Sequence, residues 1–202
     1  MKKVSLIWAH PRNDSLTSKI SSAVQGVLLE HEYAVNELDL YRLNFNPVLH
    51  EIDEPDWNNI DKVYSDEVTK YAENLQRSEA LFIVFPIWWY SMPAILKGYI
   101  DRVWNYGITY GESRHLPCKT IRWIALAGEP QESFEKRGLD KSMIHNLNVG
   151  IAGFCGAPDS KVTILYDTLG EATDNIVDHH NDLIKITKDM ALEWINSHSS
   201  QA

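Results

Sequence analysis

The chain has 202 residues, of which 44% are hydrophobic and 23% charged, and this length is enough for one domain to bury a substantial core. Its formal net charge of −9 opposes nucleic-acid binding, and no apolar run approaches the roughly 20 residues that span a bilayer. The start does not resemble a signal peptide, and Cys118 and Cys155 stand in no metal-ligand spacing. We therefore expect one cytoplasmic domain, residues 1–202, with reduced packing thiols.

The first half of the chain predicts two strand-helix units. An apolar run at 4–9 predicts a buried strand, and apolar residues at helical spacing follow over 16–28, with Ser15 and Thr17 as suitable N-cap residues. Residues 33–40 predict a second strand, and the pattern over 57–77 predicts a second helix. We expect the acidic run at 51–56 between them to be exposed.

The second half repeats this alternation three times. Strands are predicted at 80–85, 120–127 and 161–166, and helices at 94–104, 141–154 and 171–197, with Pro93 in a first helical turn and 197–202 as a frayed end. Parallel strands need crossovers that cover the faces of the sheet. The alternation therefore predicts an α/β fold, a flavodoxin-like doubly wound five-stranded parallel sheet in the order 2-1-3-4-5.

In such a sheet, ligands bind at the carboxyl ends of the strands, so the loops after strands one, three and four are the candidates. The first loop offers polar groups directly before a helix, whose N-terminal N–H groups and dipole favour a phosphate. These residues are His10, Arg12, Asn13, Ser15 and Thr17. The alternative is that Ser15 and Thr17 only cap the helix while His10 satisfies a backbone group.

The third loop places three large aromatic residues where a polar turn is expected. Pro86, Ile87, Trp88, Trp89 and Tyr90 follow directly on the third predicted strand. Aromatic faces and loop backbone groups suit a flat ring such as an isoalloxazine. In isolation, a core or dimer cluster explains them equally well.

The fourth loop, with Ala127 and Gly128, allows a ligand to approach the backbone closely, although one glycine is a weak signal. Three competing motifs are absent from the sequence. It contains no G-x-G-x-x-G after the first strand, no phosphate-loop motif and no G-x-S-x-G elbow. These absences argue against a Rossmann dehydrogenase, a phosphate-loop NTPase and a hydrolase with a nucleophile elbow.

Several strings of residues resemble the flavodoxin-like NAD(P)H:quinone oxidoreductases, the group that includes DT-diaphorase, modulators of drug activity and oxidoreductase partners of potassium-efflux systems. They lie at 9–11 with 15–17, at 39–47, and at 85–104, followed by Tyr110-Gly111 and the fourth loop. The match runs through about residue 160 in the order and spacing of that family.

The resemblance implies a non-covalent flavin whose phosphate-bearing tail lies near His10 and 15–17 and whose ring lies against 86–90 and 127–128. The 39–47 string is most similar to the FAD-using branch, so FAD is preferred and FMN is second. The resemblance also implies a homodimer with active sites at the interface, reached by aromatic residues such as Tyr110. Turnover would be ping-pong, with hydride from NADH or NADPH passing through flavin N5 to a quinone-like acceptor.

This chain departs from the family pattern at three places. Residues 126–129 read Leu-Ala-Gly-Glu where the family has Thr-Thr-Gly-Gly, and Trp88 stands where many members have Gln. Phe134 and Asp140 occupy the places of a Tyr and a His that assist charge in DT-diaphorase-like members. Neither can donate a proton in the same way, so no catalytic residue is assigned. The predicted substrate pocket then consists of Tyr110, Phe134 and Trp89.

Two other functions remain open: a flavin-binding regulatory partner of a membrane ion-efflux system, and a one-electron carrier of the flavodoxin type. A metal site at His179-His180 is not expected, because adjacent helical side chains point about 100° apart. We expect these two histidines to lie on a solvated helix face. His115 and His145 are expected at the surface or at an interface.

Overall fold

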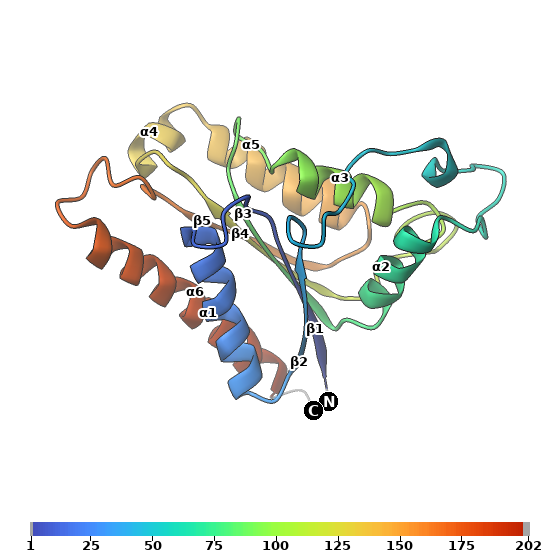
Figure 1. Cartoon of the computed structure of the whole chain (residues 1–202), viewed down its shortest axis with the longest axis horizontal. Helices are drawn as coiled ribbons and strands as arrows, with labels where there is room; N and C mark the ends of the chain where they lie inside the picture. The colour runs from blue at the N-terminus through green and yellow to red at the C-terminus, as the bar shows by residue number, and fades with distance from the viewer. Residues whose placement is uncertain (1, 200–202) are drawn as a thin grey trace.

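A computed structural model of the chain, which describes residues 2–199, contains one five-stranded parallel sheet in the order β2-β1-β3-β4-β5 (Figure 1). The strands are β1 (Lys3–Trp8), β2 (Ala34–Asp39), β3 (Ala80–Pro86), β4 (Thr120–Leu126) and β5 (Asp159–Leu165). The predicted fold class and strand order are confirmed.

The helices connect successive strands. They are α1 (Leu16–Glu30), α2 (Asp66–Gln76), α3 (Ala94–Val103), α4 (Gln131–Lys136), α5 (Leu139–His145), the π-helical η2 (Asn146–Gly153) and α6 (Ile176–Ser199), with a short 3-10 turn, η1 (Glu51–Asp53). Within residues 2–199, no helix is both long and apolar enough to cross a membrane.

Three predicted helix boundaries are wrong. The second helix starts at Asp66, not at residue 57, because Ser65 caps it by accepting a hydrogen bond from the Val68 N–H at 3.4 Å. The last helix starts at Ile176, not at 171, because the N–H groups of Glu171 and Ala172 donate to the Asp167 carboxylate and form a turn instead. The predicted helix at 141–154 begins earlier, at Leu139, and its second half is π-helical. The sixth helix continues through residues 197–199, predicted to fray, while 200–202 lie outside the described residues.

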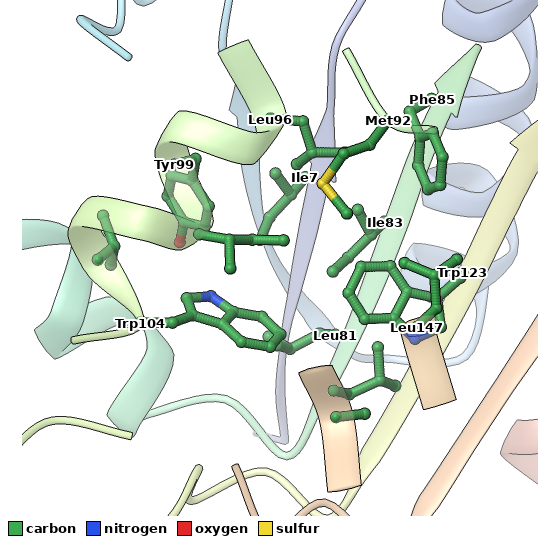
Figure 2. Close-up of a cluster of buried hydrophobic side chains, with 14 of the residues drawn as sticks. Ile7, Leu81, Ile83, Phe85, Met92, Leu96, Tyr99, Trp104, Trp123 and Leu147 are labelled. Carbon is green, nitrogen blue, oxygen red and sulfur yellow. The ribbon is translucent and has the colours of Figure 1, made fainter. Parts of the chain in front are cut away.

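Both faces of the sheet are buried, which explains the uninterrupted apolar runs. Along β3, Leu81, Ile83 and Phe85 face a core formed with α2, α3, α5 and η2, while the alternating residues face a second core formed with α1 and α6. Figure 2 shows the first core, where Trp123 and Leu147 close the layer over β3 and β4. Each such side chain contributes about 1.5–3 kcal/mol when fully buried.

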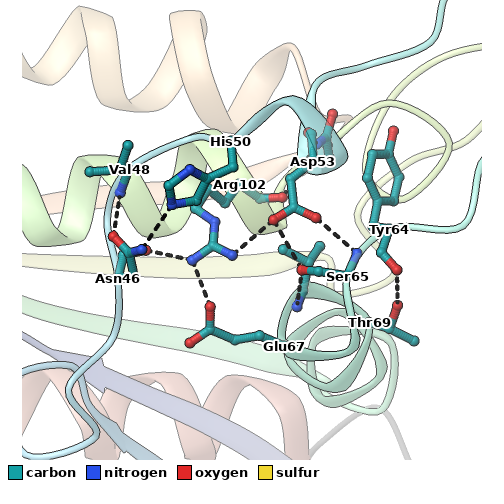
Figure 3. A network of polar contacts seen from close by, with 11 residues as sticks. Asn46, Val48, His50, Asp53, Tyr64, Ser65, Glu67, Thr69 and Arg102 are labelled. Carbon is teal, nitrogen blue, oxygen red and sulfur yellow. Dashed lines mark hydrogen bonds and ion pairs between the residues drawn. The ribbon is translucent and has the colours of Figure 1, made fainter.

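A buried ion pair fastens the long connection between β2 and α2 to α3 (Figure 3). The Arg102 guanidinium lies 2.8 Å from the Asp53 carboxylate and 2.7 Å from that of Glu67, and Ser65 donates to Asp53 from its N–H and its hydroxyl. Burial alone would raise the pKa of Asp53, but the bonds from Arg102 and Ser65 outweigh it and hold this pKa below its ordinary value. Asp53 is fully buried, so the expected exposure of the 51–56 run is wrong at this position.

The two cysteines are free and buried in the first core, as predicted for packing thiols. Burial raises the pKa of Cys118 to about 12. Burial also raises the pKa of Cys155, whose thiol lies 3.7 Å from the Thr109 hydroxyl. Both thiols are therefore protonated at neutral pH.

Candidate functional site

The loops after β1, β3 and β4 lie at one edge of the sheet, because these strands are parallel neighbours (Figure 1). Each loop holds a group of the predicted cofactor residues. The contacts between the loops decide whether these groups form one site.

The first loop ends in a helix N-terminus prepared for an anion. Ser15 is the N-cap of α1, and its buried hydroxyl accepts from the Ser18 N–H at 3.2 Å. The other first-turn N–H groups, those of Leu16 and Thr17, have no partner within the helix. The first turn carries no acidic residue, so nothing there competes with a phosphate. The capping role foreseen as the alternative is thus real for Ser15 and leaves room for an anion.

His10 joins the first loop to its neighbours. Its ring Nδ1 lies 3.1 Å from the Arg12 N–H nitrogen, and Arg42 donates to the carbonyl oxygens of His10 and Pro11 at 2.6 Å and 2.8 Å. Burial lowers the pKa of His10, and the nearby Arg12 and Arg42 cations act in the same direction, so the ring is neutral at pH 7. The ring centroids of His10 and Trp88 are 6.2 Å apart, so the first and third loops meet.

The third loop is a tight hairpin with strained aromatic residues at its tip. Trp88 and Ser91 exchange backbone hydrogen bonds of 2.9 Å and 3.1 Å across it. Trp89 and Tyr90 between them have φ values of 51° and 57°, the left-handed conformation usually left to Gly or Asn in such turns. This conformation costs roughly 1–2 kcal/mol per residue. It leaves Trp89 96% exposed.

A cavity of about 270 Å³ lies between the third and fourth loops. Its walls are Ile87, Trp89, Tyr90, Ala127, Gly128, Glu129 and Phe134. Six of the predicted cofactor and pocket residues therefore share one cavity, and of its walls Glu129 alone was not predicted. Pro86 ends β3 directly before it, and Asn13 is exposed in the first loop.

Phe134 forms the buried back wall of this cavity. Its ring centroid lies 5.5 Å from that of Tyr90 and 5.7 Å from that of Tyr166, a residue that the sequence pattern did not single out. Burial raises the pKa of Tyr166 to about 12, and the Glu135 and Asp140 carboxylates act in the same direction. The phenol is therefore protonated at neutral pH. Asp140 is buried, and within residues 2–199 its Oδ1 has no hydrogen-bond partner.

Polar contacts cross the mouth of the cavity and were also missed by sequence reasoning. Arg137 donates to the Tyr90 hydroxyl at 2.5 Å, and a second guanidinium nitrogen lies 3.9 Å from the Glu129 carboxylate. Ser133 donates to the same carboxylate at 2.8 Å. Arg137 and Ser133 belong to α4 and its C-cap, and this helix of six residues is too short to show a periodic pattern.

Tyr110 does not join the other predicted pocket residues within one chain. It lies beyond the far end of α3, where its ring contacts those of Trp57, Tyr106 and Phe154 at centroid distances of 6.4, 5.9 and 5.2 Å. Trp57 and Phe154 are exposed, so this cluster presents an aromatic surface away from the three loops.

A larger cavity, of about 860 Å³, runs along the edge strand β5 and α6. Its main charged group, Arg122, is held by the Asp159 carboxylate through bonds of 2.8 Å and 3.0 Å. Burial would raise the pKa of Asp159, but the bonds from Arg122 outweigh it and lower this pKa. Arg122 and Asp159 therefore neutralise each other, and the cavity lies away from the strand ends that the fold uses for ligands.

The remaining histidines do not form a site. His179 and His180 bond through Nε2 to the carbonyl oxygens of Tyr166 and Thr168, at 3.1 Å and 3.0 Å. Among residues 2–199, no three His, Cys, Asp or Glu side chains are grouped to hold a metal ion. His115 and His145 are exposed.

Comparison with known proteins agrees with this geometry. Residues 2–186 match the family described as flavodoxin-like fold. A relative named as an NAD(P)H oxidoreductase, YcaK of Escherichia coli, is 48% identical over 168 residues, which cover 83% of this chain and 85% of the relative.

Two solved structures share the fold. The NAD(P)H:quinone oxidoreductase from Methanothermobacter marburgensis has a TM-score of 0.84 at 24% identity, with 94% of each chain covered. An FMN-dependent NADH-azoreductase from Bacillus anthracis, solved in complex with FMN, has a TM-score of 0.67 at 18% identity and covers 96% of this chain and 99% of its own. The predicted resemblance is confirmed.

Proposed function

Because the chain belongs to the flavodoxin-like fold family, we propose that it is an NAD(P)H oxidoreductase that uses a bound flavin to reduce quinone-type acceptors. The observation that carries this proposal is the meeting of the first and third loops. His10 and Trp88 bring a helix N-terminus suited to phosphate next to an aromatic hairpin suited to a flat ring.

The residues present fit a flavin. The α1 N-terminus, with Ser15, Leu16 and Thr17, would hold its phosphate. The hairpin 86–90 and the Ala127-Gly128 backbone would hold the ring. The cavity of about 270 Å³ lies near the small end of the roughly 300–1,000 Å³ range for ligand pockets, so it suits a ring system and not a whole dinucleotide.

When bound, the flavin would supply N5, through which hydride passes from NADH or NADPH to the acceptor. The chain would contribute orientation and exclusion of water: Trp89 and Phe134 cover a flat guest, and neutral His10 adds no charge at the phosphate. Since the cavity has room for the flavin ring alone, we propose that donor and acceptor stack in turn on the exposed face of that ring, which is ping-pong turnover. No side chain of this chain is proposed as a catalytic acid.

We further propose a homodimer in which the aromatic surface of Trp57, Tyr110 and Phe154 covers the partner's cavity. The support is that this surface is exposed and lies apart from the three loops of its own chain, while Trp89 is uncovered at the hairpin tip. FAD is the preferred flavin and FMN the second choice. Arg42, from the segment at 39–47, extends the polar surface beside the first loop, where a longer cofactor would need contacts.

Release of the bound flavin and its chromatographic identification test the proposal most directly. We expect a yellow purified protein that releases FAD, and parallel double-reciprocal plots when NADH and menadione are varied together. A colourless protein that cannot be reconstituted with FAD or FMN would overturn it. Persistent one-electron reduction during titration would instead favour a flavodoxin-type carrier, and slow turnover with a co-purifying membrane partner would favour a regulatory role.

A further inference from the structure

The polar contacts over the cavity place a cation at its mouth. The Arg137 side chain reaches from the end of α4 to the Tyr90 hydroxyl on the hairpin, 2.5 Å away. Tyr90 and Glu129, the two residues that Arg137 approaches, both line the cavity, and the Tyr90 ring lies 5.5 Å from that of Phe134. Arg137 therefore stands at the rim of an aromatic slot and not on a remote surface.

Most of the hydrogen-bonding capacity of this guanidinium is unused. It carries five N–H donors, and among the described residues one of them serves Tyr90. Glu129 lies 3.9 Å away, beyond hydrogen-bond distance, and its carboxylate already accepts from Ser133. The side chain of Arg137 is 56% exposed, so a ligand can reach it.

The surrounding charge makes this position selective. The chain carries a net charge of −9, and the short helix α4 beside Arg137 itself contains Glu132, Glu135 and Lys136. An anion is repelled by most of this surface. It is attracted where a planar guanidinium can pair with it through two parallel hydrogen bonds.

We propose that Arg137 recognises an anionic substituent, a carboxylate, sulfonate or phosphate, on the flat molecule that stacks over the cavity, and so selects anionic over neutral ring compounds. This inference rests on the proposed function for its reaction, but not for its binding chemistry. The exposed aromatic surface of the hairpin contacts the ring of this molecule, and the guanidinium binds its substituent. Glu129 competes for the same cation and weakens the preference.

Binding of two non-reducible probes tests this without turnover. Calorimetric titration with naphthalenesulfonate and with naphthylmethanol compares an anionic and a neutral ligand of similar shape. We expect Arg137→Gln to raise the Kd of the sulfonate by roughly 10-fold or more, and to change that of the neutral probe by less than about 2-fold. Glu129→Gln should move the other way, tightening the sulfonate by about 2-fold to 5-fold.

Arg77→Gln is the matched control, because it changes the net charge by the same amount. Arg77 is similarly exposed and pairs with Glu73 on α2. The control variant should leave both Kd values unchanged. Equal weakening of both probes in Arg137→Gln, or an equal effect of Arg77→Gln, would overturn the inference.

Steady-state kinetics then identify which substrate carries the anion. With one donor, the kcat/KM ratio of a naphthoquinone sulfonate to menadione should fall roughly 10-fold in Arg137→Gln if the acceptor is recognised. With menadione fixed, a matching fall in the NADPH to NADH ratio would assign the anion to the phosphate of the donor. If both ratios stay constant while quinone reduction proceeds, the inference fails and the proposed function stands. If no quinone is reduced but Arg137→Gln still weakens the sulfonate alone, the proposed function fails and the inference about Arg137 stands.

Discussion

The Asp53–Arg102 network and the Trp88–Ser91 hairpin differ in which kind of side chain is buried and which is exposed. In the network, Asp53 and Arg102 are buried, and every carboxylate named in it has a donor. In the hairpin, large aromatic groups are exposed on a strained backbone. Buried polar groups that are paired stabilise a fold. Large apolar groups that stay exposed on an unfavourable backbone conformation instead indicate a surface that binds a ligand or partner.

Breaking the network should have the largest effect. Arg102→Met leaves the Asp53 carboxylate buried without its cation, so we expect a loss of about 3–5 kcal/mol in the free energy of unfolding, measured by urea denaturation. Arg77→Met, at an exposed ion pair, should cost less than about 1 kcal/mol. Equal losses from the two variants would show that the buried pair does not stabilise the connection.

Removing the hairpin's exposed ring should affect binding and not folding. Trp89→Ala takes away surface that would stack on the flavin, so we expect its Kd to rise about 10-fold, a change of ~1.4 kcal/mol. Flavin fluorescence titration of the apoprotein measures this, with the urea midpoint as a check on folding. The control is His179→Ala, because His179 does not line the cavity and its ring bonds to the backbone carbonyl of Tyr166; it should leave flavin affinity and activity unchanged.

Relieving the backbone strain at Trp89 should change stability and flavin binding in opposite directions. Trp89→Gly places at φ 51° the residue that best tolerates this conformation. We expect the free energy of unfolding to rise by up to about 1 kcal/mol while flavin affinity falls. A variant that is both less stable and weaker in binding would mean that the Trp89 ring contributes to the fold.

We expect the smallest effect from pH, which changes the stability that the ionised Asp53 carboxylate contributes. Asp53 has a folded-state pKa below the ordinary 3.8, so its ionised form contributes stability that is complete above this value and is lost as pH falls through the folded pKa. The difference in free energy of unfolding between the native chain and Asp53→Asn should therefore shrink as pH is lowered from about 5 to about 3. A difference that grows on acidification would contradict the assigned direction.

The sheet and the location of the site could be predicted because both depend on local pattern. Strands buried on two faces are continuous apolar runs, and the parallel alternation places the loops after β1, β3 and β4 together. Ser15 and Pro93 marked helix starts for the same reason. The family resemblance at 85–104 then directed attention to the hairpin that borders the cavity.

Other features depend on partners far apart in the sequence or on conformations against preference. Asp53 lies in an acidic run that looks solvated, and its partner Arg102 is 49 residues away. The left-handed backbone at Trp89 and Tyr90 opposes the preference of bulky residues, so propensity could not predict it. The approach of Arg137 to Tyr90 followed from α4, a helix too short for its periodicity to be recognised.

The burial of the two thiols has a chemical consequence for any chain exposed to electrophiles. Quinones alkylate cysteine through the thiolate, and because burial raises the pKa of Cys118 to about 12, this thiol stays protonated at pH 7. Cys155 is shielded in the same core. The molecule is thus built to resist covalent self-inactivation by the kind of compound its aromatic slot would admit.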